Sequence, residues 1–288
     1  MRMNRLIFKI SQLQNQLSGN DRKIADFLLE NKNIFLNSNT MELASLTKTS
    51  SSAWNRFSKR LGYKGIVELK VEIAKAETEP KEETNPDIMV QDNDTIESLV
   101  EKYKKINDYS IENTIKLIDE KIIEKVIFEI KNADRIFLCG VGASATIAFD
   151  FLQKISKIGK VAVFSPDIHS LLPNLSNITK NDLLFSISYS GETKEVVFAT
   201  EIANEKGAKT VSVTSYQKNN KLSKICDYNL FIPNVEKEIR LGAITSRNSS
   251  FFLTDLLYLG LASQDVENTM NHLLYSHNMA LKLKGKDI

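Results

Sequence analysis

From Arg135 onward, short apolar runs alternate with helix-like segments, and this alternation limits the possible folds more than any other feature of the chain. The runs, rich in β-branched or aromatic residues, are RIFLCG (135–140), VAVF (161–164), DLLFSIS (182–188), KTVSVTS (209–215) and YNLFI (228–232). Strands that alternate with helices form βαβ units, in which helices cover both faces of a parallel sheet. The sequence therefore predicts an α/β fold with a doubly wound, flavodoxin-like sheet of five parallel strands.

The N-terminal part has no such runs and predicts helices only. The stretch TMELASLTKTSSSAWNRFSKRLGYKG predicts a helix, a tight turn and a second helix over about Ser51–Leu61. We expect Thr40 to cap the first helix, Ser50 to cap the second, and Gly62 to end the second. The residues expected to form a small core are Ala44, Leu46, Phe57 and Leu61.

The charges divide the chain into parts. Residues 1–77 carry 13 Lys and Arg against 7 Asp and Glu, whereas residues 78–110 carry 4 against 9, and the remainder is nearly neutral. Residues 78–95 also contain two prolines and few large apolar groups, which is typical of a linker. We therefore predict an all-α helix-turn-helix domain over 1–77, an acidic linker and connecting helix over 78–110, and the sheet domain over 111–288.

Composition excludes several classes of protein. Two cysteines, Cys139 and Cys226, are too few for a disulfide framework, and no Cys or His cluster has metal-ligand spacing. The N-terminus lacks the apolar region of a signal peptide, and no apolar run approaches the ~18 residues of a membrane span. We expect a cytoplasmic protein with no membrane partner, no metal and no cofactor.

Two junctions between a predicted strand and a predicted helix combine glycine with hydroxyl side chains. They are GVGAS (140–144) after the first run and SYSGET (188–193) after the third. A helix N-terminus carries unpaired N–H groups and a partial positive charge, so both junctions suit a phosphate group. Glycine turns also occur for structural reasons alone, and GVGAS by itself does not decide between these readings. The absence of GxxxxGK[ST] disfavours a P-loop NTPase. The absence of GxGxxG disfavours a dinucleotide fold, although the last position of that motif can also be alanine, as at Ala145.

The sheet region resembles the SIS (sugar isomerase) domain over roughly Thr114–Ser263. The resemblance rests on FLCGVGASATIAFDFLQKISKIGKVAVF followed by DLLFSISYSGETKEVVFATEIANEKGAKTVSVTS. In that family the S-x-S-G-x-T loop holds the phosphate of a phosphosugar. The resemblance therefore implies a phosphosugar effector. The residues implied to bind it are Gly142, Ser144, His169, Ser188, Tyr189, Ser190, Gly191, Thr193 and Arg247.

The second N-terminal helix has the properties of a helix that enters the major groove of DNA. The segment resembles the N-terminal domain of the RpiR (MurR/RpiR) family of bacterial transcription regulators, which joins a helix-turn-helix to an SIS domain. That family's recognition helix begins S-x-A-T-[VI]-x-R-F, whereas residues 50–57 read SSSAWNRF, so Ser52, Ala53 and Trp54 depart from the pattern. Trp54 can pack inward or lie against DNA. The predicted DNA-binding residues are Ser50, Ser51, Ser52, Trp54, Asn55, Arg56, Lys59, Arg60 and Lys64.

Three functions fit these features. SIS domains also occur in phosphosugar isomerases, which need an acid and a base, and the candidates here are His169, Glu192, Glu195, Glu236 and Glu238. None of these residues by itself indicates catalysis, and an isomerase has no need of a basic helix-turn-helix. We therefore predict a non-enzymatic, DNA-binding regulator of carbohydrate metabolism genes that is a homodimer or homotetramer, ahead of an isomerase and of a sugar-binding scaffold.

Overall fold

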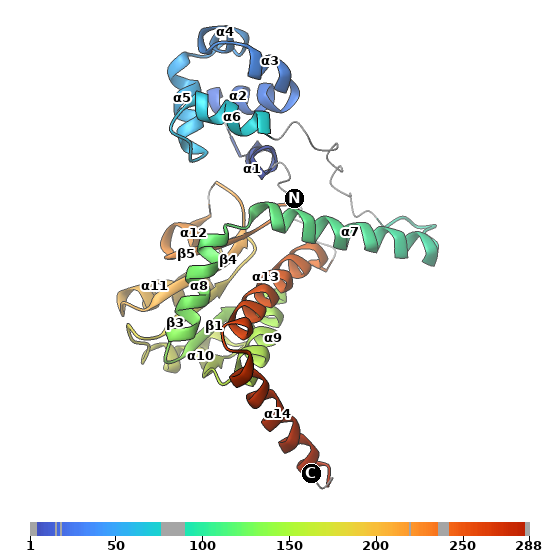
Figure 1. Ribbon diagram of the computed structural model, residues 1–288, viewed down its shortest axis with the longest axis vertical. Helices are drawn as coiled ribbons and strands as arrows, with labels where there is room; N and C mark the ends of the chain where they lie inside the picture. The colour runs from blue at the N-terminus through green and yellow to red at the C-terminus, as the bar shows by residue number, and fades with distance from the viewer. Residues whose placement is uncertain are drawn as a thin grey trace. The chain divides into compact units, whose positions relative to one another are not determined.

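The computed structural model describes residues 5–14, 16–17, 19–75, 90–218, 220–235 and 242–285. The chain divides into two compact units (Figure 1). The first, here called the head, comprises Met1–Asp87 with Tyr216–Asn219, and the second, the body, comprises Ile88–Ser215 with Asn220–Ile288. Among the described residues, no helix has the combination of length and apolar character that crossing a membrane requires.

The described part of the head is helical, as predicted. Its helices are α1 (Arg5–Gln14), α2 (Gly19–Glu30), α3 (Lys32–Asn37), α4 (Thr40–Leu46), α5 (Ser51–Arg60) and α6 (Ile66–Lys75). They enclose one apolar core to which every one of these helices contributes buried side chains. The pair α4 and α5, joined by residues 47–50, is the helix–turn–helix that the sequence predicts.

The ends of α4 and α5 show which capping predictions hold. Ser50 caps α5, because its Oγ accepts a hydrogen bond from the Ala53 N–H at 3.2 Å. The expected cap of α4 is wrong: Asn39, not Thr40, precedes the helix, and Asn39 Oδ1 accepts from the Glu42 N–H at 3.0 Å. The Glu42 carboxylate in turn accepts from the Asn39 N–H at 2.7 Å, which completes a capping box.

Trp54 packs inward, which settles the two alternatives that its spacing left open. Its ring has no exposed surface, stacks on Phe35 with centroids 5.4 Å apart, and meets Phe27 edge-on at 6.2 Å. It therefore belongs to the core and is removed from the predicted DNA contacts. The predicted core residue Leu46 is also wrong, since it is 54% exposed, whereas Ala44 and Phe57 are buried as expected.

The body contains a five-stranded sheet in the order β2-β1-β3-β4-β5, with every pair parallel. This confirms the predicted α/β fold. The strands are β1 (Ile136–Gly140), β2 (Ala162–Phe164), β3 (Leu183–Ile187), β4 (Lys209–Ser215) and β5 (Tyr228–Ile232). The described helices of the body are α7 (Ile96–Leu117), α8 (Glu120–Asn132), α9 (Ala143–Lys157), α10 (Ile168–Leu175), α11 (Lys194–Glu205), α12 (Lys221–Ile225), α13 (Ile244–Ser263) and α14 (Val266–Leu283).

The strands form because each run is short and rich in apolar or β-branched residues, and the three central strands β1, β3 and β4 are buried on both faces. One face packs against α8, α9 and α13, and the other against α10, α11 and α12, so two apolar cores flank the sheet. After β1 the chain crosses to β2 on one side and then to β3 on the other. Ligands in such folds bind beyond the carboxyl ends of the strands at this switch point, here between β1 and β3.

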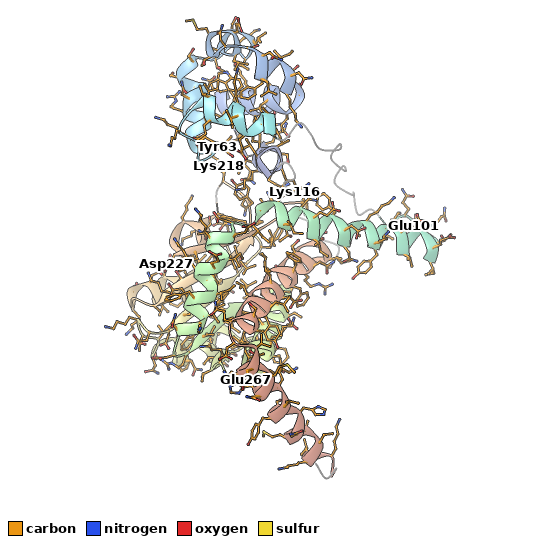
Figure 2. All side chains as sticks on the ribbon, viewed as in Figure 1. Tyr63, Glu101, Lys116, Lys218, Asp227 and Glu267 are labelled. Atoms are coloured by element: carbon orange, nitrogen blue, oxygen red, sulfur yellow. The ribbon has the colours of Figure 1, made fainter. Side chains whose placement is uncertain are left out.

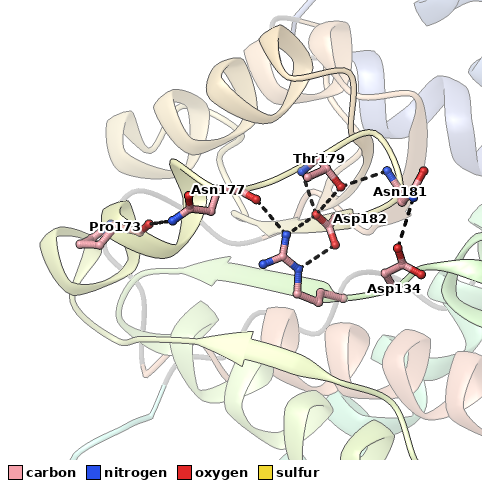
Figure 3. Close-up of polar contacts among 7 residues, drawn as sticks. Asp134, Pro173, Asn177, Thr179, Asn181 and Asp182 are labelled. Atoms are coloured by element: carbon pink, nitrogen blue, oxygen red, sulfur yellow. Dashed lines mark hydrogen bonds and ion pairs between the residues drawn. The ribbon is translucent and has the colours of Figure 1, made fainter.

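A charged cluster closes the opposite, amino edge of the sheet (Figure 3). Arg135 donates two hydrogen bonds to the buried Asp182 carboxylate, at 3.0 and 2.7 Å, and the Thr179 N–H and hydroxyl donate to the same carboxylate. Burial raises the pKa of Asp182, but the hydrogen bonds from Arg135 and Thr179 outweigh it and hold the pKa below its ordinary value. The Arg135–Asp182 pair therefore ties the starts of β1 and β3 together.

Candidate ligand-binding and DNA-binding sites

The two glycine- and serine-containing loops begin at paired positions of neighbouring strands. Gly140, the last residue of β1, lies opposite Ile187, the last residue of β3. Because both strands run in the same direction, the loops 141–142 and 188–193 leave the same edge of the sheet side by side. The structure therefore brings the two predicted ligand loops together at the switch point.

Hydrogen bonds within the second loop fix its shape. Ser188 is buried, and its Oγ lies 2.8 Å from Thr193 Oγ1 and accepts from the Gly191 N–H at 3.1 Å. Ser190 Oγ accepts from the Glu192 N–H at 3.2 Å. Ser190 and Thr193 are both half-buried. The buried Ser188 thus holds the loop in shape from its inner side, while the side chains of Ser190 and Thr193 remain partly accessible from outside.

Asn220 supports the loop from the neighbouring β4–α12 connection. A β-carbon added to Gly191 would lie 1.9 Å from Asn220 Oδ1, so only glycine fits there, and the φ of +66° also favours glycine. The buried Asn220 side chain donates to Thr214 Oγ1 at 2.6 Å and accepts from the Ser223 N–H at 2.9 Å. Sequence reasoning missed Asn220, although an asparagine just before a predicted helix is a recognisable capping signal.

The helices that follow the strands differ in how they begin. Side chains cap α10 and α12, from Asp167 and Asn220 respectively. The residue before α9 is Gly142, which has no side chain, and the residue before α11 is Thr193, whose side chain makes no capping hydrogen bond. Both helices at the switch point therefore begin with N–H groups that no side chain caps, as does α13 after β5. This arrangement suits an anion.

His169 lies at a helix start of a different kind. It is exposed on α10, and the Asp167 carboxylate caps this helix by accepting from the His169 N–H at 3.3 Å and the Ser170 N–H at 2.9 Å. Hydrogen bonds from the Ser170 side chain and backbone hold the pKa of Asp167 below its ordinary value. A negative charge already occupies this helix start, so it does not suit a phosphate.

Two further predicted ligand residues come from the loop and from α13. The Tyr189 ring is buried in the core on the α8, α9 and α13 side, and its hydroxyl accepts from the Val235 N–H at 3.0 Å. This burial does not support a ligand contact by the Tyr189 side chain, which instead positions the loop.

Two polar groups on the first turns of α13, Arg247 Nε and Thr245 Oγ1, are buried and have no hydrogen-bond partner in the described chain. Ser144 is half-buried on the first turn of α9.

Of the groups considered for isomerase chemistry, Glu192 already has a structural partner. The Glu192 carboxylate accepts from the Lys221 N–H at 2.8 Å, at the start of α12. Glu236 and Glu238 lie outside the described residues. Burial raises the pKa of the Cys139 thiol to about 12, which leaves it unreactive. Over the described ranges, no group of three or more His, Cys, Asp or Glu side chains could hold a metal ion.

On the head, the exposed side of α5 carries the predicted DNA-binding side chains. Ser52, Asn55, Arg56 and Lys59 are exposed, as is Lys64 beyond the helix. Ser50 Oγ and Ser52 Oγ lie 2.8 Å apart, and Ser51 is half-buried.

Two of the predicted DNA contacts already have partners in the head. Arg60 forms an ion pair with Asp21 of α2, and Asn55 Oδ1 accepts from the Ile66 N–H at 3.4 Å. Arg56 and Lys59 have no carboxylate partner in the described chain, so their charges are available to a polyanion.

Comparison with known proteins agrees with this architecture. Residues 4–80 match the helix-turn-helix domain of the rpiR family, and residues 129–260 match the SIS domain. An uncharacterized HTH-type transcriptional regulator of Caldanaerobacter subterraneus subsp. tengcongensis is 31% identical over 271 residues, covering 94% of this chain and 95% of the relative. The uncharacterized HTH-type transcriptional regulator YbbH of Bacillus subtilis is also 31% identical, covering 92% and 93%.

Two solved structures are similar to this chain. NanR of Vibrio vulnificus, complexed with ManNAc-6P, is 25% identical with a TM-score of 0.61, covering 96% of this chain and 98% of NanR. The sugar isomerase domain of an RpiR transcription factor from Sphaerobacter thermophilus has a TM-score of 0.57 at 19% identity, covering 62% and 98%, and shows the fold alone.

A helix-turn-helix head joined to an SIS body defines a transcription regulator rather than a metabolic enzyme. The chain belongs to the RpiR family of HTH-type transcriptional regulators.

Proposed function

We propose that this regulator binds a phosphosugar at the β1/β3 switch point and that the ligand changes the affinity of the head for an operator in carbohydrate metabolism genes. The observation that carries the proposal is the pair of adjacent helix starts, α9 and α11, that no side chain caps and that hydroxyl groups surround. The ManNAc-6P bound by NanR is a ligand of this class and supports the proposal. The phosphate would contact Ser144, Ser190 and Thr193.

In this proposal each predicted part of the chain has one task. Residues 1–77 read DNA in the cytoplasm, residues 78–110 connect, and residues 111–288 bind the effector without a cofactor. The Arg247 guanidinium on α13 and His169 on α10 would face the sugar. The exposed face of α5 would lie in the major groove with Arg56 and Lys59 toward DNA.

The packing of α13 against α7 offers a route from ligand to head. Ser249 Oγ donates to the Ser110 carbonyl at 3.4 Å, and the Asn248 amide donates to Asn107 of α7. Figure 2 labels Glu101 and Lys116 on α7, whose N-terminal end follows the acidic linker. A ligand that shifts α13 through Arg247 would therefore shift α7. Typical coupling of about 1–3 kcal/mol changes affinity roughly 5–150-fold.

We propose a homodimer or a homotetramer, because helix-turn-helix proteins usually read two half-sites about one DNA turn apart. Helix α14 supports an oligomer, because none of its described side chains is buried. Figure 2 shows Glu267 near the start of this helix. The large apolar side chains that α14 exposes are Val266, Met270, Leu274, Tyr275, Met279 and Leu283. A second copy would cover this face.

The test measures thermal stability against a panel of sugar phosphates, and then adds each stabilising sugar to a gel-shift assay with the DNA upstream of the protein's own gene. A ligand at 100 Kd raises stability by about 2.7 kcal/mol. We expect one sugar to raise the Tm and change the gel shift while remaining chemically intact. Conversion of that sugar to another, with no duplex retained, would instead show an isomerase.

Variants locate the two sites within the same assay. Ser190→Ala with Thr193→Val should remove the sugar response and leave operator binding, whereas Arg56→Ala should weaken operator binding and leave the sugar-induced Tm shift. Ser263→Ala, an exposed serine at the end of α13, serves as the control and should change neither. A sugar response that survives the double substitution would show that the pocket lies elsewhere.

A further inference from the structure

The turn between α4 and α5 has the hydrogen bonds of a Schellman motif, the helix ending that places one residue in the left-handed region. The Lys48 N–H donates to the Ser45 carbonyl at 3.1 Å, and the Thr49 N–H donates to the Ala44 carbonyl at 2.8 Å. Lys48 occupies the left-handed position, with φ of +51°. A side chain with a β-carbon is strained there, and glycine is the usual occupant.

The same motif ends three other helices of this chain, and glycine occupies each of them. The corresponding residues are Gly62 after α5, Gly159 after α9 and Gly207 after α11, with φ of +93°, +82° and +75°. Among the described non-glycine residues, only Lys48 and Ala243 have a positive φ. The chain therefore uses glycine at this position except in the turn of the helix-turn-helix, where it keeps a lysine.

The neighbours of Lys48 hold the turn in this conformation. Thr47 Oγ1 donates to the Leu43 carbonyl at 2.7 Å and accepts from Trp54 Nε1 at 3.2 Å. It also lies 2.8 Å from Thr49 Oγ1, and because its single proton is already used, Thr49 must be the donor. The Thr47 hydroxyl is thus saturated, and it joins the turn to the buried Trp54 of α5.

The Lys48 side chain does nothing for the fold that would explain its presence. It is exposed, and its ammonium group has no hydrogen bond or ion pair within the part of the chain that the structure describes. Strained residues that persist without a structural reason cluster at functional sites. The turn immediately precedes Ser50 and the start of α5. In a recognition helix, the N-terminal residues are the ones that contact DNA.

We propose that Lys48 binds a DNA phosphate, and that the strained turn is retained because it fixes this cation beside the start of α5. The inference rests on the proposed DNA-binding function. A backbone phosphate is the expected partner rather than a base edge, because an ammonium group acts as a point charge and most protein–DNA hydrogen bonds go to phosphates and sugars.

The test compares Lys48→Gly with wild type in the full-length protein. Glycine relieves the strain and removes the charge, so the Tm should rise while DNA affinity falls. Binding to the operator and to an unrelated duplex should weaken by the same factor, roughly fivefold to tenfold per head at about 0.1 M salt. The slope of log K against log salt should fall by about 0.9 per head.

Matched variants separate strain from charge. Lys48→Arg should retain the salt slope, and Lys23→Gln, at an exposed lysine of α2, should leave DNA binding unchanged. Gly207→Lys places the same side chain in the same motif of the body, where the nearest atom to a β-carbon is 3.7 Å away. It should lower the Tm, which calibrates the strain.

Opposite results would overturn the proposal in distinguishable ways. A wild type that binds DNA together with a Lys48→Gly variant of unchanged affinity and salt slope would contradict this contact alone. A loss confined to the operator would show a base contact instead of a phosphate contact. A wild type that binds no duplex would contradict the proposed function, and the contact with it.

Discussion

Helices α5 and α11 both begin after a hydroxyl residue, and the two hydroxyls behave differently. Ser50 caps α5 by accepting from the Ala53 N–H. Thr193 precedes α11 but makes no capping bond, because its hydroxyl lies 2.8 Å from Ser188 Oγ within the loop. The first helix start is completed by its own chain, while the second keeps its N–H groups uncapped by side chains. The difference separates a hydroxyl that caps a helix from one that we propose binds a ligand.

The largest expected effect comes from breaking the loop that keeps α11 uncapped. Gly191→Ala would force a β-carbon to 1.9 Å from Asn220 Oδ1. Asn220 cannot move away without losing its cap of α12, so we expect a loss of about 3 kcal/mol in unfolding free energy and no sugar response. Thermal denaturation with and without the sugar phosphate measures both.

Gly207→Ala, at the glycine that follows the far end of α11, is the matched control for this substitution. Gly207 has a similar φ of +75°, but the nearest atom to an added β-carbon lies 3.7 Å away, which is ordinary contact. It should therefore show only the cost of the left-handed backbone, about 1 kcal/mol. Equal losses for the two variants would show that the contact with Asn220 does not hold the loop.

The sequence predicted the elements of both regions better than their contacts. The five strands appear within one residue of the apolar runs, because short β-branched runs between helical segments have few alternative structures. The two ligand loops were also predictable, since parallel strands place successive carboxyl ends at one edge.

Side-chain partners were less predictable, because they depend on the folded path of the chain and in most cases on residues distant in sequence. Nothing near Thr193 indicates that its hydroxyl turns to Ser188 rather than to the helix, and nothing near Gly191 points to Asn220. Likewise the inward packing of Trp54 depends on Phe27 and Phe35 of other helices. Local spacing could only leave both orientations of Trp54 open.

A smaller effect is expected when the completed helix start of the head is loosened. Trp54→Phe keeps an aromatic ring beside Phe35 but removes the Nε1–H that donates to Thr47 Oγ1. We expect a loss of about 2 kcal/mol from the smaller ring and the missing hydrogen bond. DNA affinity should fall with it, because the turn before α5 loses its anchor. Chemical denaturation followed by gel shift below the transition tests this; unchanged DNA affinity in a destabilised head would show that the anchor does not position the turn.

The smallest expected effect tests the comparison directly by giving α11 the cap that α5 already has. Asp is a strong capping residue, and its charge favours a helix N-terminus. Thr193→Asp should therefore raise the unfolding free energy by about 0.5–1 kcal/mol and remove the sugar response, since the carboxylate takes the place proposed for the phosphate. Ser50→Asp should leave stability nearly unchanged, because one cap replaces another, and should weaken DNA binding through charge repulsion. Calorimetry of both variants measures these changes. A Thr193→Asp protein that is no more stable than wild type would show that the first N–H groups of α11 already have partners. The two helix starts would then not differ in the way proposed.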